Sequence, residues 1–373
     1  MKGAKHKKGS DYLVRATIRH PGADNTSRID GGIQRLFTME ILPISFSASG
    51  STITQDKFKV EEFPDGYEYK LKLRMGVYIK ALSGWFLGRI QDPTIDRNGP
   101  AGYLEVSGTP AKVPVGITEV IDKSETPQKY LSKCPEVGDC YWTANTFGKA
   151  TFFTALERAD PQILADYEEV PGGVTTAATL THWELDSSRL SDVTSLNSSA
   201  KECTDKLYGP SARVFMGAVS SNATLYQGTP PEWDEESKTF SFKVASPHVN
   251  EKGLPNKGFY TLYIPIDQAT CRWGQDASLP QAQVQIVNQD GTASITTAVA
   301  KQENGLLRFN IAGFGYSSPT IRLKMGDQTF GATPVAQQAT SKPAKKAIIC
   351  AKGKLTKQVV AVNPKCPAGY KKK

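Results

Sequence analysis

The sequence has no apolar run of the roughly 20 residues that a membrane-spanning helix needs. Its longest candidate, LFTMEILPISF at 36–46, is interrupted by Glu40 and Pro43, and we interpret it as a pair of strands. No G-x-S-x-G, H-E-x-x-H, phosphate-loop or dinucleotide-binding motif occurs. The sequence therefore predicts no membrane span, and it offers no catalytic residue, metal ligand or cofactor.

Acidic residues are absent from 342–373, a segment that holds ten lysines, and the first eight residues add four more. Subtracting these 14 positive charges from the formal charge of +8 leaves −6 for residues 9–341. The basic character therefore belongs to the two ends, and the body is mildly acidic. Specific nucleic-acid binding normally requires a basic face on a recognisable module, so we expect none. Basic ends do attract polyanions in general.

Histidine is scarce, with four residues, and no two cysteines have the C-x-x-C spacing of zinc or redox sites. An even number of widely spaced cysteines favours three disulfides and an oxidising compartment. Six reduced thiols in a cytosolic protein remain the alternative. Of the fifteen possible connectivities we expect the sequential one, since its first and last pairs close short loops: Cys134–Cys140, Cys203–Cys271 and Cys350–Cys366. No signal peptide is visible, because no apolar segment follows the basic residues 2–8. Export would thus require a different start or another route.

Alternation of apolar and polar residues dominates the body, as in strands with one buried face. It occurs in YEYKLKLRM (67–75), FSFKV (240–244), LRFNI (307–311) and IRLKM (321–325). The dipeptides Asp290-Gly291 and Asn304-Gly305 favour tight turns, which predicts a three-stranded antiparallel meander over 283–312. The fold class is therefore mainly β, with two antiparallel β-sandwich-like domains.

Helical spacing occurs in the middle of the chain, where Phe152, Phe153 and Leu156 share a stripe and Asp160-Pro161 can begin a second short helix. This pattern predicts a short helical connector. The expected domains are an N-terminal β domain (10–118), a helical or irregular connector (119–178), a C-terminal β-sandwich of immunoglobulin-like type (179–328), a linker (329–346) and a basic tail (347–373).

The tail is expected to form a small hairpin, 347–352 with 357–362, that turns across 353–356 and is closed by Cys350–Cys366. Such an element has almost no core, so it needs the disulfide. Its lysines would form the polyanion-binding site: Lys345, Lys346, Lys352, Lys354, Lys357, Lys365, Lys371, Lys372 and Lys373.

The last 26 residues, IICAKGKLTKQVVAVNPKCPAGYKKK, resemble a C-terminal element of uncharacterised exported surface proteins of actinobacterial type. The matching residues are Cys350, Lys352, Gly353, Lys354, Thr356, Lys357, Pro364, Lys365, Cys366, Pro367, Gly369, Tyr370 and Lys371. Short segments of the body, such as SGWFLGRIQDPTI at 83–95, resemble those proteins more loosely. The resemblance implies an extracellular or cell-surface location and no catalytic residues.

Three stretches of the body deserve a functional and a structural interpretation. TIDRNGPAGYLE (94–105) partly matches a calcium loop but lacks its leading carboxylate, so we interpret it as a hairpin turn at Asn98-Gly99. His182, Glu184 and Asp186 lie on one face of a predicted strand, which we interpret as solvated. Trp233 is surrounded by charge and is the best candidate for an exposed sugar-binding aromatic, whereas Trp85 is expected in the core.

The sequence thus favours a non-catalytic secreted or cell-surface protein that is displayed near an anionic cell wall by its tail. The partner would be an anionic cell-wall polymer or glycan. The alternative is an extracellular hydrolase or carbohydrate-binding protein that acts on wall polysaccharide, for which paired carboxylates in a groove would be the mark.

Overall fold

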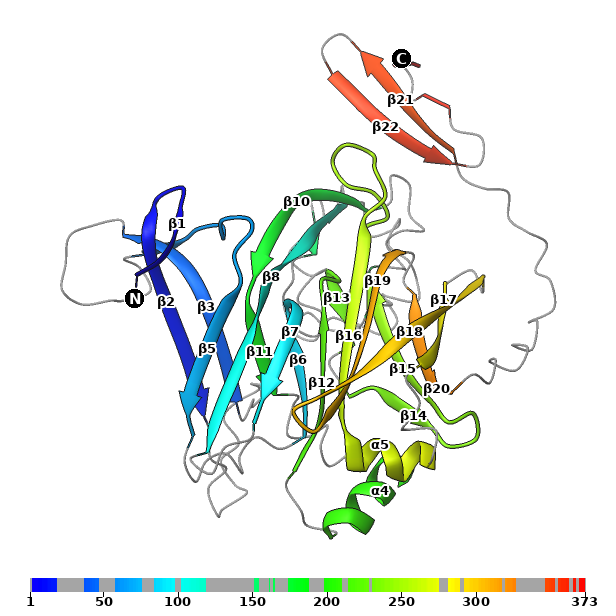
Figure 1. Cartoon of the computed structure of the whole chain (residues 1–373). Coiled ribbons are helices and arrows are strands. Elements are labelled where there is room, and N and C mark those ends of the chain that lie inside the picture. The colour runs from blue at the N-terminus through cyan, green and yellow to red at the C-terminus, as the bar shows by residue number, and fades with distance from the viewer. Residues whose placement is uncertain are drawn as a thin grey trace, which may run out of the picture.

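The computed structural model is built mainly from β-strands, with two α-helices among the residues it describes (Figure 1). It describes residues 2–18, 37–46, 58–75, 84–97, 102–118, 151–153, 161, 164, 174–187, 198–209, 214–227, 230–274, 281–288, 292–316, 319–326, 346–352, 355–361, 365–366 and 369–372. Within these ranges, none of the helices is long and apolar enough to cross a membrane.

One sheet of fifteen strands runs through the whole body. Its path in space is β1 (Lys2–His6), β2 (Gly9–Ile18), β3 (Phe37–Phe46), β11 (Glu184–Ser187), β6 (Gly84–Gly88), β12 (Phe215–Ser221), β16 (Lys257–Pro265), β19 (Leu306–Gly315), β18 (Ala293–Glu303), β17 (Gln281–Val287), β20 (Thr320–Met325), β15 (Thr239–Ala245) and β13 (Leu225–Tyr226). Two short strands flank this path, β4 (Phe58–Val60) beside β3 and β14 (Glu232–Asp234) beside β15.

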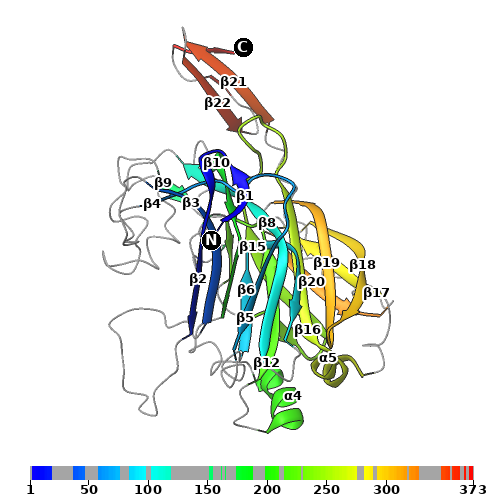
Figure 2. The same cartoon turned by 60° about the vertical axis from the view of Figure 1, so that its left-hand side comes forward.

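A second sheet of five strands faces the first part of this path. It contains β10 (Thr175–His182), β8 (Tyr103–Thr118), β5 (Tyr69–Arg74), β7 (Ile90–Asp96) and β9 (Thr151–Phe153). Figures 1 and 2 show the blue and cyan strands grouped on one side and the gold strands on the other, with β6 and β12 between them. This arrangement confirms the predicted mainly β, sandwich-like class.

Among the described residues, two large hydrophobic cores lie in the body, with a small cluster of Ala111, Val113 and Phe259 beside them, and β6 contributes to both large cores. Trp85 and Leu87 pack in the core of the second half, while Phe86 on the opposite face packs in the core of the first half. All five residues of β6 are buried. Because β6 also pairs with β11 and with β12, it lies at the junction where one sheet serves two cores.

The predicted strand faces are confirmed in three of the four stretches: Phe240, Phe242 and Val244 of β15, Leu307, Phe309 and Ile311 of β19, and Ile321, Leu323 and Met325 of β20 are buried. In 67–75 only Leu71 and Met75 are buried, Tyr69 and Leu73 are partly buried, and Tyr67 lies outside β5 and is exposed. The meander is also confirmed, since β17 pairs with β18 and β18 with β19 in antiparallel register. Asn304 and Gly305 both have positive φ, 51° and 74°, which is the conformation a tight hairpin turn of this type requires.

Two local predictions are corrected, and two helices were missed. Residues 37–46 form one continuous strand, β3, because Pro43 still pairs with Tyr12 across the ladder. Phe152 and Phe153 lie in strand β9, paired to β8, and not in a helix, as their aromatic side chains favour. The helices α4 (Ser198–Tyr208) and α5 (Ile266–Trp273) were not predicted. Pro161 and Leu164 are helical and buried, as the predicted second short helix requires, and most of the remaining connector and of the linker lie outside the described residues.

The boundary between the two predicted domains is crossed by hydrogen bonds. β10 pairs with β8, and β11 pairs with β3 and β6, so residues 179–187 join the strands of the first half. Trp183, between these two strands, packs in the first core and donates its Nε1–H to the carbonyl of Gly108 at 3.0 Å.

Candidate functional site

The basic tail forms its own three-stranded sheet. β21 (Lys346–Lys352) lies in the middle, between β22 (Leu355–Ala361) and β23 (Lys371–Lys372). The predicted hairpin is confirmed, with a shorter turn than expected because the pairing extends to Lys352 opposite Leu355. The returning strand β23 was not predicted, and it places Lys371 opposite Ala351 and Lys372 opposite Cys350.

The disulfide Cys350–Cys366 closes this sheet as predicted, with the two Cα atoms 5.6 Å apart. Cys350 is fully buried, so the disulfide lies in the interior of the tail element. Gly369 has φ of +85°, a conformation that favours glycine. A Cβ at this position would lie 3.3 Å from Nζ of Lys352. The glycine therefore lets the returning chain pass close to β21.

The described lysines of the tail are exposed, namely Lys352, Lys365, Lys371 and Lys372. Lys346 and Lys357 lie on β21 and β22, and the structure describes only their backbone. Lys345, Lys354 and Lys373 lie outside the described residues. The sheet therefore gathers at least six basic positions on one disulfide-closed element, in a segment without any carboxylate side chain.

The second predicted disulfide, Cys203–Cys271, is also confirmed, with a Cα–Cα distance of 5.9 Å. It joins α4 to α5. Cys134 and Cys140 lie outside the described residues. Disulfides of this kind are compatible with an extracellular protein, because thiols stay reduced in the cytosol.

The prediction that His182, Glu184 and Asp186 form a solvated face is wrong. Asp186 is buried, and His182 and Glu184 are partly buried. The cause is tertiary packing. His182 ends β10, whereas Glu184 and Asp186 lie on β11 between β3 and β6, where Glu184 meets the buried Arg89. Nε2 of His182 is buried and has no hydrogen-bond partner among the described residues. This burial, with the nearby charge of Arg89, lowers the pKa of His182 to about 3.

Arg89 is the residue of this region that sequence reasoning missed. It is almost fully buried, and its guanidinium donates hydrogen bonds to the carbonyls of Ala223 and Thr224. Nε lies 3.4 Å from a carboxylate oxygen of Glu184, and the guanidinium stacks on Tyr226 at 4.5 Å from the ring centre. Arg89 thus connects β11 to the segment that follows β12, which is a structural role.

Trp233 is not an exposed aromatic, which corrects that prediction. It is 3% exposed and packs against Phe240 and Trp273, with its Nε1–H donated to Glu235. Trp85 is in the core as predicted. In 94–105, β7 and β8 pair as a hairpin with Asp96 opposite Glu105, and the predicted turn residues Asn98-Gly99 lie outside the described residues. Among the residues that the structure describes, no group of three or more His, Cys, Asp or Glu side chains could hold a metal ion.

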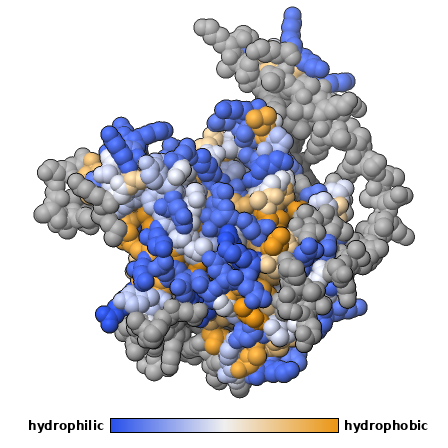
Figure 3. Space-filling view, in the orientation of Figure 1, coloured by the Kyte–Doolittle hydropathy of each residue, from blue (hydrophilic) through white to orange (hydrophobic). Residues whose placement is uncertain are grey.

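The broad face over β5 and β8 is hydrophilic (Figure 3). Lys70 and Lys72 both pair with Glu105 there, at 2.8 and 3.3 Å. Mutual pairing of exposed charges is typical of a solvated surface. This face therefore offers no arrangement of side chains that points to a ligand.

Comparison with known proteins yields no relative: no family model, no curated protein and no solved structure matches this chain.

Proposed function

We propose that this chain is a non-catalytic extracellular or cell-surface protein, displayed near an anionic cell wall through its basic C-terminal tail. The observation that carries the proposal is the compact tail sheet, in which one disulfide and three short strands collect lysines and no acid. Charges that are held together on a small rigid element bind a polyanion better than the same charges dispersed along a chain, because less conformational freedom is lost on binding.

Two further observations support display over catalysis on wall polysaccharide. The aromatic residue on which sugar binding depended, Trp233, belongs to the core. The carboxylates of Glu40 and Glu184, which face each other on neighbouring strands, are each paired with an arginine, Arg15 and Arg89 respectively. Paired in this way, they stabilise the sheet.

The test is binding of the full chain to a purified anionic wall polymer at about 0.05 M and about 0.5 M salt, a range over which screening changes strongly. Replacing the four exposed tail lysines Lys352, Lys365, Lys371 and Lys372 by glutamine is expected to reduce the affinity about a thousandfold at low salt. This estimate takes about 1 kcal/mol for each lysine near an anionic surface.

The matched control removes the same charge from exposed lysines of the body, Lys59, Lys243, Lys252 and Lys257. This variant should bind as the wild type does. An equal loss in both variants would show that net charge alone attracts the polymer, and binding that ignores salt would show that the interaction is not electrostatic. Either result would refute the proposal.

A further inference from the structure

A cavity of about 500 Å³ lies at the end of the body that carries the two helices. Its walls come from the end of β7, the start of β12, the junction of β16 with α5, the end of α4 and the turn between β18 and β19. The residues on which the argument depends are Arg97, Tyr208, Phe215, Ile266, Asp267 and Leu306. Cavities of roughly 300–1,000 Å³ are typical of small-molecule sites. Hydrophobic residues also reach the surface at this end (Figure 3).

Arg97 brings a cation into this cavity, and it forms no ion pair with a described carboxylate. Its guanidinium lies 4.1 Å from the centre of the Phe215 ring. Nε is buried and has no hydrogen-bond partner among the described residues. Burial lowers the pKa of Arg97 to about 10, so the side chain is still charged at neutral pH. A mostly buried guanidinium costs free energy unless hydrogen-bonded anions compensate it, and its planar donors match a carboxylate.

Asp267 brings the opposite charge to the same cavity. The hydroxyl of Tyr208 donates a hydrogen bond to its Oδ2, and the backbone N–H of Gln268 donates one to Oδ1 at 2.7 Å. Asp267 also begins α5, where the helix dipole stabilises a negative charge. Arg97 and Asp267 feel each other's charge, but they form no ion pair, for which a nitrogen and an oxygen must lie within 4.0 Å. Both charged groups thus line the cavity without an ion pair between them.

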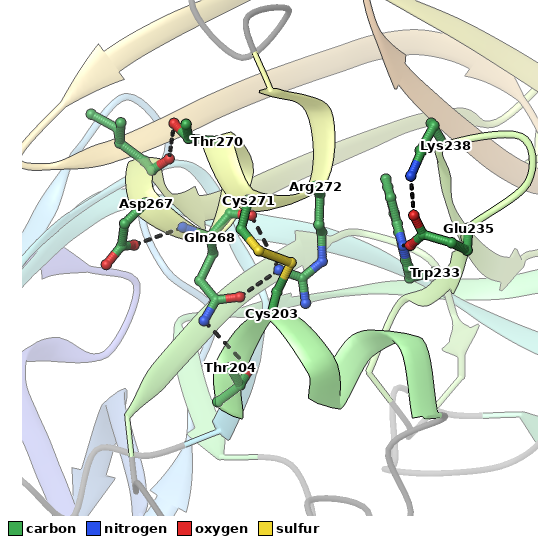
Figure 4. Close-up of a disulfide and its surroundings, with 11 residues drawn as sticks. Cys203, Thr204, Trp233, Glu235, Lys238, Asp267, Gln268, Thr270, Cys271 and Arg272 are labelled. Carbon is green, nitrogen blue, oxygen red and sulfur yellow. Dashed lines mark hydrogen bonds and ion pairs between the residues drawn. A yellow bond between two sulfur atoms is a disulfide. The ribbon is translucent and has the colours of Figure 1, made fainter. Parts of the chain in front are cut away.

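The two helices of this wall are tied to each other, as Figure 4 shows. The disulfide Cys203–Cys271 joins α4 to α5. Arg272 donates to the backbone carbonyl of Gln268 at 3.2 Å, within α5, and Gln268 donates to Thr204 on α4 at 3.4 Å. The wall that bears Tyr208 and Asp267 is therefore held in place before any ligand binds.

We propose that this cavity binds a small zwitterion, an α-amino acid with an apolar side chain. Its carboxylate pairs with Arg97, its ammonium group pairs with Asp267, and its side chain lies against Ile266 and Leu306. A dianion such as phosphate suits the cavity less well, because Asp267 repels it. This site goes beyond display at a cell wall and does not depend on the tail.

The experiment is calorimetric titration of the full chain at pH 7 with L-leucine and with three comparison ligands. The first, 4-methylpentanoate, lacks the ammonium group, and the second, 3-methylbutylamine, lacks the carboxylate. The third is inorganic phosphate. Leucine is expected to bind at least about tenfold more tightly than each of the other three, because a charged hydrogen bond contributes about 1.5–3 kcal/mol. Arg97→Gln should weaken leucine binding by at least about tenfold. Asp267→Asn should reduce it to the level of 4-methylpentanoate.

Arg74→Gln is the control, since Arg74 is exposed at the end of β5 and should leave binding unchanged. Arg97→Gln should also unfold at the same or a higher denaturant concentration than the wild type, because burial of this charge outweighs its attraction to Asp267. Arg97→Lys keeps the charge but loses the planar donors, and it should bind leucine more weakly than the wild type. The proposal is overturned if no ligand binds the wild type, if phosphate or 4-methylpentanoate binds as tightly as leucine, or if Arg97→Gln binds leucine normally.

Discussion

Arg89 offers the sharpest test of how the two halves of the body are joined. Replacing it by methionine, which has a similar length and no charge, removes hydrogen bonds to Ala223 and Thr224 and the ion pair with Glu184. The two carbonyl oxygens would then be buried without this donor. Because Arg89 is 1% exposed, water cannot take its place.

The expected cost follows from these contacts. Hydrogen bonds to a charged group contribute about 1.5–3 kcal/mol each, and removing one partner of a buried ion pair costs about 3–5 kcal/mol. The carboxylate of Glu184 keeps partial access to water, with 23% of its side chain exposed, which reduces the penalty. We therefore expect Arg89→Met to lower the free energy of unfolding by about 4 kcal/mol.

The assay is equilibrium unfolding in urea, where the midpoint and slope give the free energy of unfolding. Arg15→Met is the matched control, because Arg15 pairs with Glu40 on the same sheet at 2.7 Å but is 47% exposed. Exposed pairs contribute less than about 1 kcal/mol, so this variant should be nearly as stable as the wild type. If Arg89→Met costs no more than Arg15→Met, the structural role given to Arg89 is refuted.

Three further predictions concern the body. The pKa of His182 is lowered to about 3 in the folded chain from about 6.5 in an unfolded one. The unfolded state therefore takes up the proton first, and stability falls as the pH drops from 6.5 towards 3. In urea unfolding at pH 7 and pH 4, His182→Leu should lose this part of the acid sensitivity, and an unchanged pH dependence would contradict the assignment. Replacing Cys203 and Cys271 together by alanine opens a loop with a sequence separation of 68 residues and should lower stability by about 4 kcal/mol in the chain-entropy model, whereas an unchanged melting temperature would mean that the disulfide does not constrain the unfolded chain. Trp233→Ala should lower it by about 3–5 kcal/mol, as expected for a buried aromatic, and a loss below about 0.5 kcal/mol would be the behaviour of a surface residue.

The strands could be predicted from the sequence because their signals are local. Strict alternation predicted the buried residues of β15, β19 and β20, and the dipeptide Asn304-Gly305 predicted the turn between β18 and β19. The i, i+3, i+7 spacing of an amphipathic helix also occurs at Ile266, Ala269 and Trp273. Helix α5 could therefore have been predicted from the sequence. In α4 the only strongly apolar residue is Leu207, and that helix depends on the Cys203–Cys271 disulfide and on contacts with α5.

The misassigned residues share a different cause. Alternation shows that a strand has two kinds of face, but it does not show whether the polar face is open to water. His182 and Asp186 were misassigned for this reason. β10, which ends at His182, pairs with β8, and β11, which holds Asp186, pairs with β3 and β6, so residues far apart in the chain meet there. Arg89 gave no local signal at all, since its acceptor Ala223 is 134 residues away. The cavity with Arg97 and Asp267 likewise forms only when distant segments meet.

The most direct test of display by the tail is retention on washed cell walls. The chain truncated before Lys342 should keep the melting temperature of the body and should appear in the medium, while the full chain stays with the wall and is released as salt rises from about 0.05 to about 0.5 M. A variant with Cys350 and Cys366 both replaced by serine should be retained less well, because closing that loop stabilises the tail sheet by roughly 3 kcal/mol. Retention of the truncated chain at the wall would contradict the account.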